Sequence, residues 1–476
     1  MSECFLDVAG LRVIDAASGK IIVDGASLRV ASGGVLTLLG ESGSGKSLLA
    51  QAIMGTLAPG LRAEGAITID GQRHDAADQQ SRQHLWGRAV ALLPQEPWLA
   101  LDPTMRVLHQ IAETHELVAG KSAGQSREAA LRDLRQLGMM DAAHLYPHQI
   151  SGGMAQRVAF LATHAAGARL LIVDEPTKGL DSGKRGEMLA MLRAAQADGM
   201  TVLCITHDVW LARALGGEVA VMLDGFVIEQ GRAEQLLAQP AHAYVRALMA
   251  ADPAAWPVRP AAHVPGEIVA RVQGVAKTFG NRCLFSGISA ELRRGEVVAV
   301  TGDSGSGKTT FGNLLLGLLR PDAGTVTRAK GLARTAFQKL YQDPAAAFAP
   351  TLTLRAALAD VLALHGLQWD ALAPLLARLR LAETLLDRLP SQVSGGELQR
   401  FALARVLLLK PALIFADEPT SRLDPITQQE TLNLLLEVAG ESGCAVLLVT
   451  HDAEIARAVG QRGIELGGGV GLRAAR

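Results

Sequence analysis

The chain contains one set of four short motifs twice, and this repeat limits the possible folds more than any other feature. A glycine-rich loop, GESGSGKS at residues 40–47, returns as GDSGSGKT at 302–309. Further along, ISGGMAQR returns as VSGGELQR, VDEPTKGLD as ADEPTSRLD, and CITHD as LVTHD. Both halves keep the same order, and the later three motifs keep nearly the same spacing. The repeat therefore predicts duplication of a whole domain rather than a short solenoid unit.

A proline- and alanine-rich stretch separates the two copies. The sequence ADPAAWPVRPAAHVPGEI begins at residue 251, and its prolines favour extended backbone over helix. A chain of 476 residues has room for more than one domain at roughly 100–200 residues each. We therefore expect a first domain at 1–250, a linker at 251–267 and a second domain at 268–476.

Short apolar runs lead into the motifs. VLTLLG and VVAVTG precede the two glycine-rich loops, LLIVDE and LIFADE end in two acids, and TVLCITHD and AVLLVTHD end in His–Asp. Such runs alternate with helical patterns, which is typical of buried parallel strands in an α/β domain. Motifs at the carboxyl ends of these strands predict a ligand site at that edge of the sheet.

Composition argues against several other classes of protein. The 46 basic residues balance 47 acidic ones, and a net charge of −1 gives no electrostatic footprint for nucleic acid. No apolar run reaches the ~18 residues of a membrane span. The N-terminus lacks the basic start of a signal peptide. Four scattered cysteines favour reduced cytosolic thiols over a metal site.

Both glycine-rich loops match the phosphate-binding pattern G-x-x-x-x-G-K-[ST]. The glycines let backbone N–H groups curl around phosphates, the lysines reach the β- and γ-phosphate oxygens, and the following hydroxyls ligate Mg²⁺. A structural turn is the alternative, but each loop follows an apolar run, opens a helical pattern and occurs twice. The expected phosphate-binding residues are Gly40, Glu41, Ser42, Gly43, Ser44, Gly45, Lys46, Ser47, Gly302, Asp303, Ser304, Gly305, Ser306, Gly307, Lys308, Thr309 and Thr310.

Two adjacent carboxylates end an apolar run in each half. The first of each pair, Asp174 or Asp417, can hold the metal shell through water. The second, Glu175 or Glu418, can act as general base on an attacking water. An isolated Asp–Glu pair is commonly a solvated strand end, but repetition beside a phosphate loop favours the catalytic interpretation.

A histidine and a glutamine recur near these motifs. His207 and His451 follow apolar strands, from which each could bond the γ-phosphate, and we expect them to take part in catalysis. Gln95 and Gln342 follow short apolar runs, and each could reach Mg²⁺ or the attacking water. A lone loop glutamine is most often just solvated, so these two gain weight only from the repeat.

The remaining motif would be a second phosphate-holding element in each half. A hydroxyl and two glycines before a helical pattern can hold an anion on backbone amides at a helix start. These residues are Ser151, Gly152, Gly153, Ser394, Gly395 and Gly396.

Together the motifs resemble those of the ATP-binding-cassette (ABC) ATPases, and the likeness spans nearly all of both halves. The resemblance implies for each half a RecA-like α/β core, an antiparallel β subdomain and a helical insert, at 96–149 and 343–392. It implies ATP and Mg²⁺ as cofactors. Cassettes of this family pair head to tail, so residues 151–153 would cover the nucleotide held by Lys308. Residues 394–396 would cover the nucleotide held by Lys46.

The finer resemblance is to the ATPases of oligopeptide, dipeptide and nickel importers. YPHQISGGMAQRVAF, LYQDPAAAFAPTLTLRAAL and the tail QPAHAYVRALMAADP are similar to segments of that group, in which two separate ATPases serve one transporter. This chain is similar to both fused. The resemblance implies an ATPase peripheral to the cytoplasmic face of the inner membrane, two permease subunits and an extracytoplasmic solute-binding protein.

The halves differ at one expected adenine contact. Phe279 stands where an aromatic residue of this family stacks on adenine, whereas the first half has only Val13 or Ile14 nearby. An aliphatic contact lacks the aromatic stacking term of ~0.5–1.5 kcal/mol. We therefore predict weaker nucleotide affinity at the Lys46 site than at the Lys308 site.

Two other functions remain open from the sequence. One is a soluble twin-cassette ATPase that acts on ribosomes or nucleic acid, although the short linker and neutral charge disfavour it. The other is a scaffold that binds ATP without turnover. Both halves keep the candidate general base, Glu175 or Glu418, and this disfavours the scaffold. The cargo stays open among peptides, nickel or metal chelates, opine-like molecules and phosphorus compounds.

Overall fold

The structure is a computed structural model that describes residues 4–95, 100–180, 182–259, 266–303 and 305–467. Its residues form two compact units, one up to Met249 and one from Ala250 onward, apart from the segment Gly179–Ser182, which groups with the second. Within the described ranges, we find no helix whose length and apolar character would let it span a bilayer.

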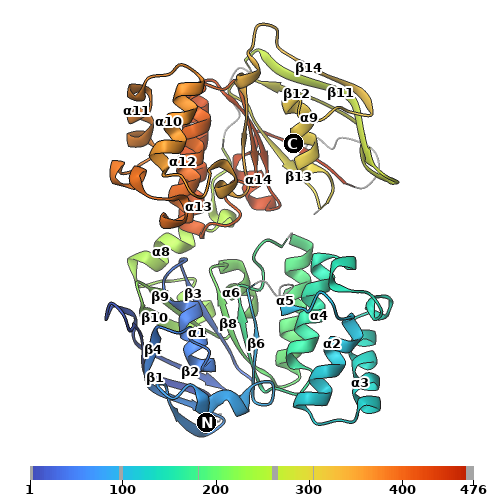
Figure 1. The fold of residues 1–476 in the computed structure, drawn as a ribbon, viewed down its shortest axis with the longest axis vertical. Coiled ribbons are helices and arrows are strands. Elements are labelled where there is room, and N and C mark those ends of the chain that lie inside the picture. The colour runs from blue at the N-terminus through green and yellow to red at the C-terminus, as the bar shows by residue number, and fades with distance from the viewer. Residues whose placement is uncertain (1–3, 96–99, 181, 260–265, 304, 468–476) are drawn as a thin grey trace. The chain divides into compact units, whose positions relative to one another are not determined.

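The first unit contains two sheets (Figure 1). One is antiparallel, with the order β2 (Ile21–Ala31), β1 (Cys4–Asp15), β4 (Leu61–Ile69) and β5 (Gln72–Asp75). The other is parallel apart from its first pair, with the order β10 (Phe226–Arg232), β9 (Glu218–Leu223), β3 (Val35–Gly40), β8 (Thr201–Thr206), β7 (Leu170–Asp174) and β6 (Val90–Leu93).

The second unit repeats this arrangement with fewer strands. Its antiparallel sheet has the order β12 (Arg282–Arg293), β11 (Ile268–Phe279) and β14 (Ala323–Arg328). Its parallel sheet has the order β15 (Phe337–Leu340), β16 (Leu413–Asp417), β17 (Ala445–Val449), β13 (Val297–Thr301) and β18 (Arg462–Glu465).

Helices pack on these sheets and form the two inserts. The first unit contains α1 (Lys46–Met54), α2 (Val107–Glu113), α3 (Ala123–Gln136), α4 (Gly152–His164), α5 (Ser182–Ala197), α6 (Val209–Leu215), α7 (Ala233–Leu236) and α8 (Ala243–Ala250). The second contains α9 (Lys308–Leu316), α10 (Leu354–Leu364), α11 (Ala373–Arg378), α12 (Gly395–Leu407), α13 (Pro425–Glu441) and α14 (Ala453–Val459). The expected RecA-like core, antiparallel subdomain and helical insert are thus present in each unit.

The parallel sheets explain the apolar runs in the sequence. Every residue of β3 and β8 is buried, as expected for strands covered on both faces. Helix α1 contributes Leu49 and Ile53 to a core that also contains Val8 and Leu38, one from each sheet. The order β3–β8–β7 places the ends of three strands side by side, and the order β13–β17–β16 does the same in the second unit. The motifs that follow these strands therefore meet at one edge.

The first part of the predicted linker packs on the second unit. Trp256 is only 7% exposed and belongs to a core cluster with residues of that unit. Its indole N–H donates to the carbonyl oxygen of Ala251 at 3.1 Å, and the backbone N–H of Arg259 donates to the carbonyl of Ala458 at 2.7 Å. Residues 260–265 lie outside the described ranges.

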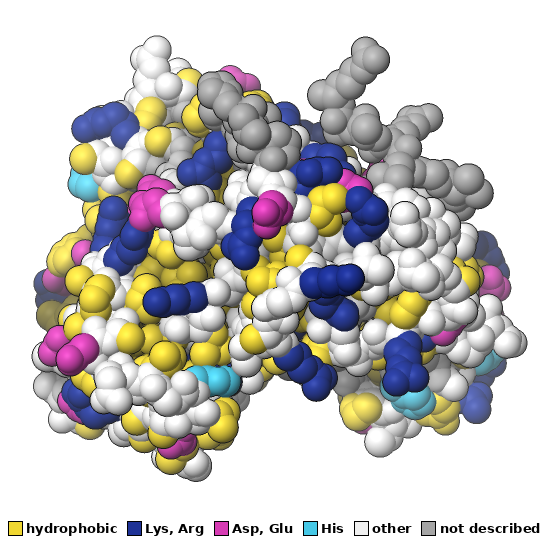
Figure 2. Space-filling view, turned by 90° about the horizontal axis from the view of Figure 1, so that it is seen from above, with side chains coloured by type: hydrophobic (Ala, Val, Ile, Leu, Met, Phe, Trp, Pro, Cys, Tyr) yellow, Lys and Arg dark blue, Asp and Glu magenta, His cyan; other side chains and the backbone are white. Residues whose placement is uncertain are grey.

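Charges of both signs are mixed on the face seen in Figure 2. Figure 2 shows Lys and Arg side chains lying among apolar and acidic ones on the face in view. This mixture agrees with the near balance of 46 basic and 47 acidic residues in the whole chain.

Candidate nucleotide-binding sites

The first glycine-rich loop joins β3 to α1 and encloses its own lysine. Gly45 has a φ of 97°, and a Cβ there would lie 2.8 Å from the Val23 side chain, so both the backbone and the space require glycine. The buried Lys46 Nζ donates to the carbonyl oxygens of Gly40 and Glu41 at 2.9 and 2.6 Å. These bonds hold the ammonium beside the N-terminus of α1, where an anion is favoured.

The second loop has the same geometry. Lys308 Nζ donates to the carbonyl oxygens of Gly302 and Asp303 at 2.7 and 3.0 Å. Thr309 follows in the first turn of α9. Of the predicted loop residues, Ser304 lies outside the described ranges. Both loops therefore present a lysine and a helix start at the carboxyl edge of a parallel sheet.

The aspartate that ends β7 or β16 approaches each phosphate loop, although one strand lies between it and the strand that leads into the loop. Thr309 Oγ1 donates to Asp417 Oδ1 at 3.0 Å. Burial raises the pKa of Asp174, while a hydrogen bond from Ser47 acts in the opposite direction. Asp174 Oδ1 is buried and has no hydrogen-bond partner among the described residues. Hydroxyl and carboxylate oxygens that converge beside a phosphate loop fit the oxygen ligands that Mg²⁺ prefers.

A glutamate and a histidine form a close pair in each unit. Glu175 and Glu418 have φ values of 50° and 47°, a strained backbone that often marks functional positions. His207 Nδ1 lies 2.9 Å from Glu175 Oε1, and His451 Nδ1 lies 3.4 Å from Glu418 Oε2. The three strand ends thus bring the predicted lysine, aspartate, glutamate and histidine together in both units.

The environment keeps these glutamates ionised. Burial, the largest single effect, would raise the pKa of Glu175, but the charge and hydrogen bond of His207 and the charges of Lys46 and Lys178 together outweigh it, so the net pKa is lowered. Burial, again the largest single effect, would raise the pKa of Glu418, but the hydrogen bond and charge of His451 and the charge of Lys308 together outweigh it, so this pKa is also lowered. An ionised carboxylate can accept a proton, as a general base must.

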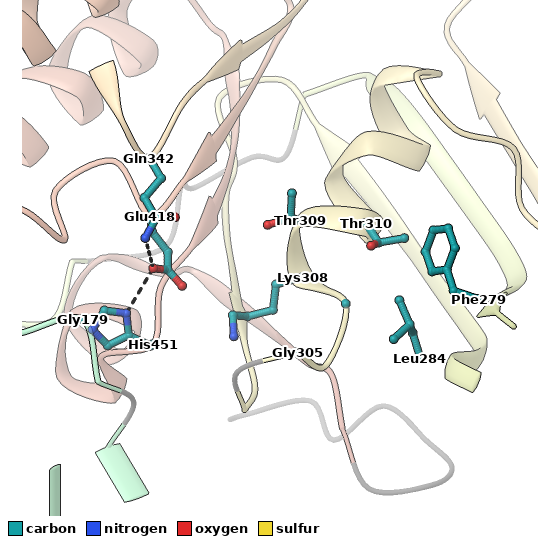
Figure 3. Close-up of a pocket in the computed structure, with 11 residues that line it drawn as sticks. Gly179, Phe279, Leu284, Gly305, Lys308, Thr309, Thr310, Gln342, Glu418 and His451 are labelled. Carbon is teal, nitrogen blue, oxygen red and sulfur yellow. Dashed lines mark hydrogen bonds and ion pairs between the residues drawn. The ribbon is translucent and has the colours of Figure 1, made fainter. Parts of the chain in front are cut away.

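The glutamine of the second unit reaches the candidate base. Gln342 Nε2 donates to Glu418 Oε2 at 2.9 Å (Figure 3). The same nitrogen lies 3.4 Å from Ser421 Oγ. Gln95 follows β6, and the next four residues of the first unit lie outside the described ranges.

The SGG segments lie at helix starts, as their sequences predict. Ser151 caps α4 by accepting a hydrogen bond from the Met154 backbone N–H at 3.3 Å. Ser394 caps α12 in the same way. The backbone N–H and the hydroxyl of Ser394 each donate to the Glu397 carboxylate at 2.8 Å. Among the described residues that line the pocket around Lys308, none belongs to 394–396. The SGG segment of the second unit therefore lies outside the pocket of that unit's phosphate loop.

The adenine side differs between the units. Phe279 is 52% exposed at the end of β11 and lines the pocket around Lys308 together with Leu284. The Lys277 ammonium lies 5.3 Å from the centroid of the Phe279 ring. Val13 and Ile14 are 0% and 6% exposed, so neither presents a free face to a ligand.

Sequence reasoning missed two basic residues near the second loop. Lys339 pairs with Asp417 at 3.0 Å, and Arg282 donates to the carbonyl oxygen of Gly305 at 3.1 Å. The signal for Lys339 was present, because a lysine interrupts the short apolar strand FQKL where the first half has Leu92. No comparable signal marks Arg282.

A phosphate loop between a strand and a helix, with an acidic strand end beside it, defines the class of P-loop nucleotide-binding proteins. This chain contains that arrangement twice. The ABC transporter family model matches residues 23–178 and 285–421, together more than half of the chain. The chain belongs to the ABC transporter family.

Curated relatives of this family match almost the whole chain. The peptidoglycan transport ATP-binding protein YejF of Agrobacterium fabrum (strain C58) is 32% identical, covering 92% of this chain and 86% of that protein. The glutathione import ATP-binding protein GsiA of Salmonella typhi is 33% identical, covering 97% of this chain and 84% of that protein. The predicted resemblance to importer ATPases with two cassettes is confirmed, and the chain is an ATP-binding, ATP-hydrolysing subunit of that kind.

A solved structure has the same fold over most of the chain. It contains the archaeal ribosome recycling factor aABCE1 in complex with the ribosomal stalk protein aP1, with a TM-score of 0.68. It is 21% identical and covers 96% of this chain and 87% of that one. At this identity the likeness concerns the fold alone.

Proposed function

We propose that both units bind Mg²⁺–ATP and hydrolyse it, and that hydrolysis drives import of a peptide-containing solute. The observation that carries this proposal is the meeting of Lys, Asp, Glu and His at one sheet edge in each unit. The mechanism assigns one role to each of these groups.

Lys46 and Lys308 bind the β- and γ-phosphate oxygens, aided by the loop amides and the helix start. Ser47 and Thr309 would hold Mg²⁺ through their hydroxyl oxygens. When bound, Mg²⁺ supplies positive charge that neutralises the phosphate oxygens.

The remaining residues act around that centre. Asp174 and Asp417 would hold the metal shell through water, and Gln95 and Gln342 would contact the metal or the attacking water. Glu175 and Glu418 accept the proton of the attacking water, because their low pKa and their histidine partners keep them ionised and oriented.

The SGG segments act across a head-to-tail pair of cassettes. Their backbone amides are at helix starts, from which they can hold the phosphates of the nucleotide in the opposite cassette. ATP then stabilises the closed pair, and hydrolysis removes those contacts. This cycle would move two membrane permease subunits at the cytoplasmic face, with an extracytoplasmic solute-binding protein delivering cargo.

The relatives support the class of cargo. One is named for peptidoglycan transport and the other for glutathione import, and both compounds contain peptide bonds. Uptake of labelled glutathione and of a labelled peptidoglycan fragment should depend on this chain in cells that also contain its membrane subunits. Uptake of both compounds that is unaffected by deleting the chain would contradict this assignment.

A further inference from the structure

The Lys339 ammonium lies among polar and aromatic side chains of the second unit. Its ammonium lies 3.0 Å from Asp417 Oδ2 and 3.5 Å from Asn313 Oδ1. It also lies 5.0 Å from the centroid of the Phe415 ring and 5.3 Å from that of Tyr341. The side chain is only 13% exposed. A carboxylate, an amide oxygen and two aromatic faces are the groups that stabilise a partly buried cation.

The two carboxylate oxygens of Asp417, the candidate metal-binding aspartate, have different partners. Thr309 donates to Asp417 Oδ1, and Lys339 pairs with Oδ2. The Asp417 side chain is 9% exposed, so water screens the ion pair little. Asp417 is thus held between a candidate Mg²⁺ ligand and a fixed positive charge.

The first unit keeps the aspartate but lacks the lysine, the asparagine and the two aromatic residues at the matching positions. Counted from the shared motifs, Leu92 stands for Lys339, Gln51 for Asn313, Ile172 for Phe415 and Pro94 for Tyr341. Asp174 Oδ1 there is buried without a hydrogen-bond partner among the described residues.

The helix residue that faces the Phe415 ring also differs between the two units. A Cβ at Gly312 would lie 2.1 Å from the Phe415 ring, so glycine provides the space for this aromatic side chain. The matching residue of α1 is Ala50. The lysine, its aromatic neighbours and the glycine therefore differ together, as a set.

We propose that Lys339 is a positioning residue that gives the second site a built-in positive charge and lowers its affinity for Mg²⁺. The inference rests on the proposed Mg²⁺–ATP site. An ammonium beside Asp417 offsets the negative charge that attracts the metal and repels the metal itself. Nucleotide binding at the second site consequently depends less on Mg²⁺ than at the first, where Leu92 stands.

The test measures Mg²⁺-dependent binding of a fluorescent ATP analogue to the full chain. Lys46→Ala silences the first site and isolates the second. In that background, Lys339→Leu and Lys339→Gln should each lower the half-saturating Mg²⁺ concentration by on the order of tenfold. Lys339→Arg keeps the charge and should leave this concentration within about twofold.

A chain carrying Lys308→Ala reports the first site as the matched reference. Its half-saturating Mg²⁺ concentration should resemble that of the Lys339→Leu chain. Superimposable Mg²⁺ curves for Lys339 and both neutral variants overturn the proposal. The proposal is also overturned if the Lys339 substitutions weaken nucleotide binding by the same factor in Mg²⁺ and in EDTA, because that result indicates a merely structural role. A Lys46→Ala chain that binds no nucleotide at any Mg²⁺ concentration instead removes the proposed second site itself.

Discussion

The two cassettes have the same geometry at the phosphate loop and its neighbouring Glu–His pair. They differ beside the strand-ending aspartate and at the predicted adenine contact. In both, the loop lysine donates to two loop carbonyls, and the strand-ending glutamate pairs with a histidine. On the metal side, Asp417 pairs with Lys339, whereas Leu92 stands at the matching position beside Asp174. The shared geometry is built by contiguous motifs, and the differences come from neighbouring strands.

The adenine side differs for a related reason. In the second cassette, β11 ends in the exposed Phe279, and the Lys277 ammonium lies over its ring. In the first, the β1–β2 connection reads DAASGKI and contains no aromatic residue. The two cassettes therefore share the residues predicted to bind phosphate, and they differ at the predicted adenine contact and beside the aspartate predicted to hold the metal. The following experiments test how far that divergence reaches.

The largest effect should come from the candidate general bases. The double variant Glu175→Gln and Glu418→Gln should lower ATP hydrolysis by roughly 10²–10⁴-fold, because neither site can then accept a proton from water. Phosphate release measures the rate, and nucleotide binding should persist. The single variants show whether the two sites contribute equally. Glu441→Gln, which changes an exposed glutamate paired with Arg378, is the control. Unchanged hydrolysis in the double variant would remove the general-base assignment.

A large effect on stability should follow from Trp256→Ala. The buried indole packs in the core of the second unit, and its removal should cost about 3–5 kcal/mol of unfolding free energy. Calorimetry should show the loss in one of two unfolding transitions. The control, Trp210→Ala, removes a 40%-exposed indole of the first unit and should cost less. Equal losses would contradict the docking of the linker segment.

An intermediate effect should reveal the crossed pairing of the cassettes. Ser151→Arg places a long cation where ATP would be covered, and it should weaken binding at the Lys308 site more than at the Lys46 site, by about tenfold. Ser394→Arg should have the reciprocal effect. Titrations in the Lys46→Ala and Lys308→Ala backgrounds separate the sites. Each variant weakening mainly the site of its own cassette would refute the head-to-tail arrangement.

The smallest effect should come from the adenine contact. Phe279→Leu removes a stacking term of ~0.5–1.5 kcal/mol and should lower affinity at the Lys308 site by about 2- to 12-fold, toward that of the Lys46 site. Phe226→Leu changes an exposed phenylalanine of β10 and should leave that affinity as it is. Equal affinities of the two sites in the unmodified protein would remove the predicted asymmetry at its source.

Much of the fold and of the candidate site followed from local patterns. Each phosphate loop could be identified because its glycines, lysine and hydroxyl follow one another in a short segment between a strand and a helix. Asp174, Glu175 and His207 were predicted to meet because parallel strands place their carboxyl ends at one edge. The order β3–β8–β7 fulfils that expectation.

Contacts between distant segments could not be predicted in this way. The pair Lys339–Asp417 depends on β15 lying beside β16, and a shift of one residue would turn the lysine to the other face of the sheet. The burial of Trp256 depends on where a segment that read as an extended linker meets the second unit.

The sequence by itself determined the duplication, the two phosphate loops and the acidic strand ends, because each is encoded in a short run of residues. The tertiary structure decided which charges face Asp417, that Val13 and Ile14 are buried, and that Gln342 reaches Glu418. These outcomes depend on strand register and on packing across many residues, and such terms are spread over the whole fold rather than written at any one position.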